Sequence, residues 1–301
     1  MTVPRLSLGP LLFHWPRQTM LDFYGSIEQS PVDVVYLGET VCSKRREFRH
    51  RDWIETAERL LAAGKEVVFS TLALIEAQSE IGYLRRLCES GEFMIEANDM
   101  SAVQLLAGKV SFVGGPSLNI NNQRSLARLV DLGLSRWVAP VEMTLTMYKA
   151  IRSATAIPIE YELLAWGRLP LAWSARCYTA RAHDLNKDDC GNCCLDYPDG
   201  MNLNTRDDED FLIINGIQMM SMKTFYRFVD HVDLGVADLL RVSPQARGTE
   251  GVLHVLDALR HGDIKPDKAL HVLEENALAG LCNGYWHGGA GMACGMAQPP
   301  T

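Results

Sequence analysis

The sequence predicts a parallel β/α barrel of the TIM type, complete or incomplete, with a cysteine-rich insertion. Short apolar or β-branched runs alternate with amphipathic segments along most of the 301 residues. Each parallel crossover needs a connection about the length of a helix, so this alternation indicates a parallel sheet. About seven or eight such units fit a closed barrel better than an open sheet. We therefore expect one domain over residues 1–301.

The strands and helices are predicted from the spacing of apolar residues and from residues that end helices. Residues 32–37 (VDVVYL) form a β-branched run that is typical of a buried parallel strand. Residues 51–63 form an amphipathic helix, and Gly64 lies just past its end. Strands chosen by the same apolar content are expected at 6–12, 66–71, 93–96, 110–113, 136–139, 157–164, 211–214 and 237–242. Helices chosen by apolar residues at helical spacing are expected at 19–27, 76–90, 101–107, 122–132, 145–153 and 251–260. The Gly- and Met-rich tail, 280–301, is expected to be irregular.

The composition narrows the class of protein. Hydrophobic residues make up 47% of the chain and charged residues 22%, as in a folded soluble protein. No run approaches eighteen consecutive apolar residues, so we expect no membrane span. The N-terminus lacks the basic region and cleavage site of a signal peptide, which predicts a cytoplasmic protein. The net charge of −8 argues against nucleic-acid binding, which needs basic patches.

Cysteines concentrate in one polar stretch, which we define as residues 177–200. It contains Cys177, Cys190, Cys193 and Cys194, half of the 8 cysteines of the chain. Thiols in the cytoplasm are kept reduced, so this density indicates a metal site or catalysis rather than disulfides. Cys42 lies in the loop after the expected strand 32–37, and barrel sites form at that end of the strands. Four thiolates, that of Cys42 among them, are therefore expected to meet at one mouth of the barrel.

The spacing of these cysteines leaves zinc and an iron–sulfur cluster both open. Zinc sites usually have paired C-x2-C knuckles, and this stretch has only Cys190-x2-Cys193, which favours a cluster. Buried inert thiols are a third interpretation, disfavoured by the acidic residues Asp188, Asp189 and Asp196 around them. Outside the stretch, Cys88 is expected in the core of helix 76–90. Cys282 and Cys294 flank the tail, and their role is open.

Two segments and the cysteine stretch carry a resemblance to a known family. The segments are GETVCSKRR at 38–46 and GRLPLAWSARC at 167–177, and they resemble the U32 peptidase-like family. CGNCC at 190–194, YPDG at 197–200 and INGIQ at 214–218 extend the match. The wider U32 signature has a histidine before a glycine where this chain has Trp166. That departure favours a divergent branch, which acts in oxygen-independent ubiquinone biosynthesis.

The resemblance implies a [4Fe–4S] cluster held by four of the cysteines. The matching positions are Cys42, Cys177, Cys190 and Cys194, whereas Cys193 matches a family cysteine that is not a ligand. It also implies a heterodimer with a UbiU-like U32 paralogue, which hydroxylates a ubiquinone precursor with prephenate as the oxygen donor. No Ser-His-Asp or H-E-x-x-H pattern indicates a functional peptidase. The alternatives are a U32-type RNA hydroxylation factor and a zinc-stabilised, non-catalytic scaffold.

The catalytic residues stay unassigned, with Glu162, Arg168 and Arg45 as candidates. The cations after Cys42 form either a rim for a dicarboxylate or a solvated loop, and they are Lys44, Arg45, Arg46, Arg49 and Arg51. We favour the solvated loop except for Arg45 and, elsewhere, Arg168. Glu162 and Glu39 act as acid or base, or pair with an arginine, which we favour. His14 is a proton donor or a hydrogen-bonded structural residue.

Overall fold

A computed structural model describes residues 3–155, 158–227 and 236–294. Parallel strands form a barrel whose interior is filled by side chains. The barrel strands are β1 (Arg5–Leu8), β2 (Val34–Leu37), β3 (Glu66–Ser70), β4 (Met94–Ala97), β5 (Phe112–Gly114), β6 (Leu134–Val138), β7 (Glu160–Trp173) and β11 (Leu239–Val242). The barrel closes because β11 pairs in parallel with both β1 and β7. The predicted TIM-type barrel is therefore confirmed, and it is complete.

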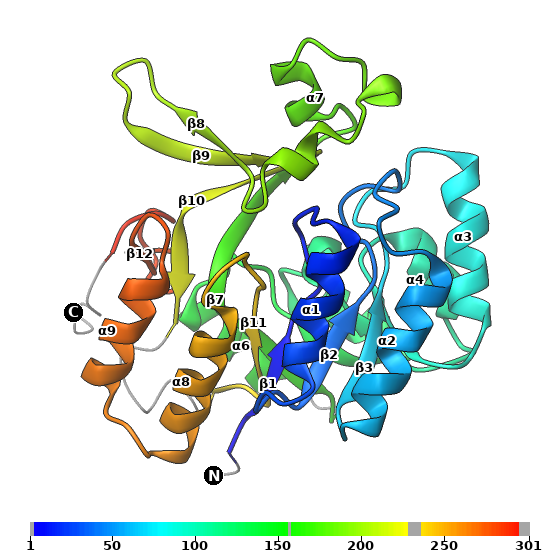
Figure 1. The fold of residues 1–301 in the computed structure, drawn as a ribbon. Helices are drawn as coiled ribbons and strands as arrows, with labels where there is room; N and C mark the ends of the chain where they lie inside the picture. The colour runs from blue at the N-terminus through cyan, green and yellow to red at the C-terminus, as the bar shows by residue number, and fades with distance from the viewer. Residues whose placement is uncertain (1–2, 156–157, 228–235, 295–301) are drawn as a thin grey trace.

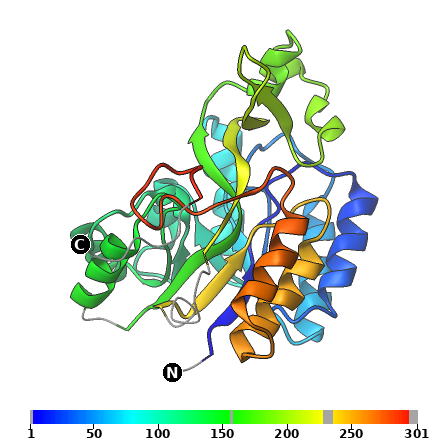
Figure 2. The ribbon, with the colours of Figure 1, turned by 90° about the vertical axis from the view of Figure 1, so that its left-hand side faces the viewer.

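Helices surround the barrel and cover the outer faces of its strands (Figures 1 and 2). They are α1 (Arg17–Ile27), α2 (His50–Ala62), α3 (Gln78–Glu89), α4 (Met100–Leu106), α5 (Gln123–Asp131), α6 (Leu145–Ala154), α8 (Thr249–His261) and α9 (Pro266–Asn276). Side-chain oxygens at Asp99, Asn122 and Thr144 accept backbone N–H groups and so start three of these helices. The apolar stripe of each helix packs on the sheet in one continuous core.

The barrel interior combines small apolar side chains with a buried layer of charges. Val34, Val68 and Val113 are fully buried inside it. Above them, the Arg241 guanidinium lies 2.7 Å from Glu162 and 2.8 Å from Glu96. Buried charges of this kind are tolerated only when paired, so the three side chains hold one another in place.

An arm replaces the helix that would follow the seventh barrel strand. Strand β7 runs 14 residues, leaves the barrel and pairs antiparallel with β10 (Gln218–Tyr226). β10 then pairs with β9 (Asp210–Asn215), and β9 pairs with β8 (Met201–Asn204). The cysteine stretch forms α7 (Tyr178–Ala182) and the short turns η2 (Lys187–Asp189) and η3 (Cys193–Asp196). Figures 1 and 2 both show this arm standing above the end of the barrel at which the strands finish.

Several expected boundaries differ from the structure. The strand expected at 157–164 begins at Glu160 and continues to Trp173, because β10 supplies an antiparallel partner beyond the barrel; residue 157 lies outside the described residues. In the tail, β12 (Leu281–Cys282) pairs with β10, so the tail is not wholly irregular; residues 295–301 lie outside the described part. Among the described helices, none is both long and apolar enough to span a membrane.

Candidate metal centre

Five cysteines line one narrow hollow between the arm and the barrel. Cys42 reaches it from the loop after β2, and the others come from the cysteine stretch: Cys177, Cys190, Cys193 and Cys194. All five are partly buried and unoxidised. The fold therefore places Cys42 beside thiols that are distant from it in sequence, at the end of the barrel where sites form.

Two lysines attach the cysteine stretch to the barrel. Lys44 donates to the Lys187 carbonyl at 2.8 Å and pairs with Asp188. Lys187 pairs in turn with Glu76, in the loop before α3. Solvent screens exposed pairs of this kind, so they contribute little to stability by themselves. The stretch is also held near its end, where the Trp15 Nε1 donates to the Pro198 carbonyl at 2.6 Å and the Ala246 N–H donates to Asp199 at 2.8 Å.

Burial in the hollow disfavours ionised thiols, whereas N–H donors beside the sulfur atoms stabilise them. Burial raises the pKa of the Cys42 and Cys194 thiols and raises the pKa of Cys193 to about 11. Opposing this, the Lys44 N–H donates to Cys42, and the Ala180 N–H donates to the Cys177 Sγ at 3.4 Å. A metal replaces the thiol protons directly, and N–H donors strengthen thiolate ligation.

The donor set suits a thiolate-bound group, but the space is small. Among residues 3–155, 158–227 and 236–294, no three His, Cys, Asp or Glu side chains converge to hold a metal ion. The hollow has a volume of about 10 Å³, which is room for about one water molecule. A bound cluster would therefore need more room between the loops than the hollow has here.

Arg45 joins three segments around the hollow. It is buried, and it donates to the Leu12 carbonyl at 2.6 Å and to Asn215 Oδ1 at 2.7 Å. It also hydrogen-bonds Cys194 and thereby opposes the rise in the pKa of that thiol that burial causes. Because it is buried and both of its Nη atoms are engaged, Arg45 holds the site together and does not form part of an open cationic rim.

A cysteine–histidine pair lies at the edge of the hollow. His14 Nδ1 is 3.2 Å from the Cys194 Sγ, a contact that nothing in the sequence indicated. Burial lowers the pKa of His14 to about 4, with a further contribution from the nearby Arg45, so this imidazole is neutral near pH 7. An activated cysteine nucleophile needs a lowered thiol pKa, whereas burial raises the pKa of Cys194. The pair therefore suits ligand positioning better than proteolysis.

The two glutamates proposed as acid or base are both engaged. Glu162 is fully buried and accepts from Ser7 at 2.6 Å, Tyr36 at 2.5 Å and Arg241 at 2.7 Å. Burial opposes its ionisation, but Arg241 and Arg136 outweigh burial and hold the pKa of Glu162 below its usual value. These hydrogen bonds place Glu162 in the barrel core, in contact with Arg241.

Glu39 stabilises the loop that carries Cys42. Its Oε1 accepts the N–H groups of Val41 at 2.7 Å and Cys42 at 3.0 Å. Burial raises the pKa of Glu39, partly offset by Arg45, whose Nη1 lies 3.8 Å away. These bonds shape the turn that presents Cys42 to the hollow.

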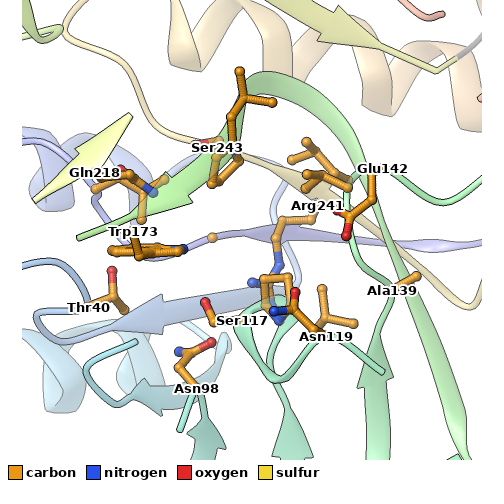
Figure 3. A pocket seen from close by; sticks show the side chains of 18 of the residues that line it. Thr40, Asn98, Ser117, Asn119, Ala139, Glu142, Trp173, Gln218, Arg241 and Ser243 are labelled. Carbon is orange, nitrogen blue, oxygen red and sulfur yellow. The ribbon is translucent and has the colours of Figure 1, made fainter. Parts of the chain in front are cut away.

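A second and much larger cavity opens at the mouth of the barrel, with a volume of about 680 Å³. Arg168, Gln218 and Thr40 line it together with Trp173. Figure 3 shows the Trp173 ring edge-on, with Gln218 and Thr40 on either side of it in that view. Further polar side chains on the wall are those of Asn98, Ser117 and Asn119. A cavity of this size is typical of sites for small organic molecules.

Comparison with known proteins assigns the family. Residues 26–262 match the family described as Peptidase family U32. The chain belongs to the U32 family. The U32 peptidase Mk0906 is 12% identical over 81% of this chain and 93% of its own, with a TM-score of 0.48.

Two other solved structures resemble this U32 chain less specifically. A putative dihydrodipicolinate synthetase from Pseudomonas aeruginosa is 8% identical over 90% of this chain and 81% of its own, with a TM-score of 0.47. Dihydropteroate synthase from Thermus thermophilus is 14% identical over 85% of this chain and 94% of its own, with a TM-score of 0.39. At these identities the likeness carries no information on activity or ligands.

The remaining arginines and cysteines singled out in the sequence of this U32 chain divide into exposed and buried residues. Arg46, Arg49 and Arg51 are exposed, as expected for a solvated loop. Cys88 is buried on α3, as predicted, and Cys282 is buried whereas Cys294 is exposed. The role of Asn215 was missed, although the motif INGIQ that contains it was noted.

Proposed function

We propose that this chain is the UbiV-type iron–sulfur subunit of a UbiU–UbiV-type complex. In this proposal the complex hydroxylates a ubiquinone precursor without O2, and prephenate donates the oxygen. One observation carries the proposal: Cys42 lines the same hollow as Cys177, Cys190 and Cys194. These positions are the ligands that the resemblance implies, and they come from two separate segments of the chain.

The chemistry of the hollow supports a cluster with thiolate ligands. Backbone N–H groups and the Arg45 side chain donate to sulfur, which stabilises thiolates and tunes a cluster's potential. When bound, a [4Fe–4S] cluster supplies one-electron redox chemistry. The chain's own residues would hold it: four cysteines ligate, Arg45 ties their loops to the barrel, and His14 faces the Cys194 sulfur.

Anaerobic co-purification with the UbiU-like paralogue tests this proposal. We expect a brown heterodimer with about four irons and four sulfides on this chain and a broad visible band that bleaches on reduction. A colourless chain with stoichiometric zinc would reject the cluster and favour the scaffold. A cell lacking the protein that accumulates under-hydroxylated RNA, with normal ubiquinone, would favour the RNA hydroxylation factor instead.

A peptide-cleavage assay tests whether this chain has the peptidase activity that the family's name suggests. Because His14 is neutral and the thiol pKa of Cys194 is raised, we expect no cleavage by the purified chain. Cleavage that disappears in the Cys194→Ala variant would show that the His14–Cys194 pair is a nucleophile.

A further inference from the structure

We propose that the cavity at the barrel mouth binds a small organic carboxylate, with the Arg168 guanidinium as its ion-pair partner. The proposal deepens the proposed function and rests on it for the part that such an anion plays in the reaction. The binding itself follows from the cavity and needs neither the cluster nor the partner chain.

Arg168 is a buried cation that lacks a close counter-charge. Only 7% of it is exposed, and its Nη1 reaches the Ser221 carbonyl at a long 3.5 Å. Its Nε is buried without a hydrogen-bond partner, and no carboxylate of the described residues lies within 4 Å of it. Burial lowers the pKa of Arg168, and Asp199 and Asp210 offset this only in part. A buried guanidinium is costly in free energy unless it is paired, so an anion that enters the cavity would supply the missing ion-pair partner.

Two neutral donors on the cavity wall are also without partners. Gln218 is fully buried and Thr40 is 3% exposed, yet the Gln218 Nε2 and the Thr40 Oγ1 have no hydrogen-bond partner. The Gln218 Oε1 already accepts from Asn215 at 3.1 Å, which leaves the amide N–H groups for another acceptor. Buried polar groups are nearly always hydrogen-bonded, and a carboxylate accepts from several donors at once.

The other residues that line the cavity indicate what the rest of the ligand, apart from its carboxylate, is like. Trp173, Leu171 and Pro116 supply apolar surface, whereas Asn98, Ser117 and Asn119 supply amide and hydroxyl groups on the side shown in Figure 3. Apolar walls with a few placed polar groups are typical of pockets for small organic ligands. A compact, hydroxyl-bearing carbon skeleton with a carboxylate matches both kinds of surface.

The charges around the cavity favour a carboxylate over phosphate. Arg241 also lines the mouth, but Glu96 and Glu162 neutralise it at 2.8 and 2.7 Å. The side chain of Glu142 also lines the cavity. Within the described residues, Arg168 is thus the cation on the cavity wall that no carboxylate approaches within 4 Å, and the negative charge of Glu142 disfavours a compact dianion such as phosphate.

Calorimetric titration of the purified chain, with or without its partner, tests the site, with benzoate, succinate, benzamide and inorganic phosphate as probes. We expect at least one of the two carboxylates to bind more tightly than benzamide and phosphate. Arg168→Met should weaken carboxylate binding at least tenfold, because it removes the ion pair and keeps the volume. Arg124→Met, which changes an exposed arginine on α5, is the matched control and should leave binding unchanged.

Stability separates a ligand-binding role of Arg168 from a structural one. Without ligand, Arg168→Met should melt at or above the wild-type temperature, because the variant no longer buries an unpaired charge. If that variant does not fold, Gln218→Ala replaces it, with a loss of at least threefold expected. The proposal is overturned if neither carboxylate binds, if phosphate binds most tightly, or if the folded variant binds carboxylates as wild type does. Iron is counted on every sample, so a colourless preparation that still binds benzoate rejects the cluster and keeps this site.

Discussion

Arg45 donates a hydrogen bond of 2.7 Å to Asn215 and so links the cysteine hollow to the cavity at the barrel mouth. On one side, Arg45 is hydrogen-bonded to Cys194. On the other, Asn215 donates to the Gln218 Oε1 at 3.1 Å, and Gln218 lines the cavity. A continuous chain of hydrogen-bonded side chains therefore connects Cys194, a proposed metal ligand, with Gln218, a proposed hydrogen-bond donor to the ligand in the cavity.

Replacing Arg45 should weaken the whole junction. Arg45→Met leaves the Asn215 Oδ1 without its buried donor, at about 1–3 kcal/mol, whereas the Leu12 carbonyl keeps the N–H of Asn215 at 2.8 Å. We expect a lower free energy of unfolding in urea and a lower iron content. Arg46→Met changes the exposed neighbour and should stay within about 0.5 kcal/mol of wild type. Equal effects of the two substitutions would contradict the structural role of Arg45.

Single alanine substitutions at the four proposed ligands should each remove the cluster. Cys42→Ala, Cys177→Ala, Cys190→Ala and Cys194→Ala each take away one thiolate, and we expect iron content to fall to near zero. Cys193→Ala should retain most of the iron, and Cys88→Ala, on α3, is the control for losing a buried thiol. Iron retained by Cys194→Ala but lost from Cys193→Ala would show that the ligand assignment is wrong.

Acid should remove the stabilisation that Glu162 provides. Its pKa in the folded chain lies below the ordinary value of 4.5, so the ionised form stabilises the fold above about pH 4.5. This contribution is lost as the pH falls from about 4.5 through the lower pKa of the folded state. Glu162→Gln leaves Arg241 without one of its two carboxylates, and we expect it to cost about 3–5 kcal/mol at pH 7.

Urea unfolding of wild type and Glu162→Gln between about pH 3.5 and pH 7 measures this effect. The difference between the two proteins should shrink on the acid side. Glu142→Gln, which changes an exposed carboxyl on the cavity rim, is the matched control for the loss of one carboxylate. A difference that stays constant over the whole range would mean that the charge of Glu162 is not what stabilises the barrel.

A glycine sets the point at which β7 leaves the barrel. Gly167 has a φ of +143°, and a Cβ there would lie 2.4 Å from the Cβ of Ser243. Gly167→Ala should therefore destabilise by more than about 1 kcal/mol, through both strain and a steric clash. Gly251→Ala, in α8 with open space around it, should instead be neutral or stabilising by up to about 1 kcal/mol. Thermal melting of the two variants checks this contrast.

The barrel could be predicted because its signals are local. The β-branched run of β2 and the apolar stripe of α2 lie within single elements, and the structure has both within about two residues of the expected bounds. Helix α9 was missed, although Pro266 in its first turn and the spacing of Ala269 and Leu273 are recognisable signals. The extension of β7 was missed for a different reason: its partner β10 lies beyond the cysteine stretch, and a strand is recognised poorly without its partner.

By itself, the sequence determined the barrel, the family and the crowding of cysteines, since periodicity and motif spacing are properties of neighbouring residues. The place of Cys42 beside the cysteine stretch was expected from the sequence, but only the tertiary structure decided that His14 contacts Cys194 and that Glu162 belongs to the barrel core. It also decided that Arg168 is buried without a close counter-charge at the mouth. These relationships join residues that are far apart along the chain, and they form only when the barrel closes and the arm folds above it.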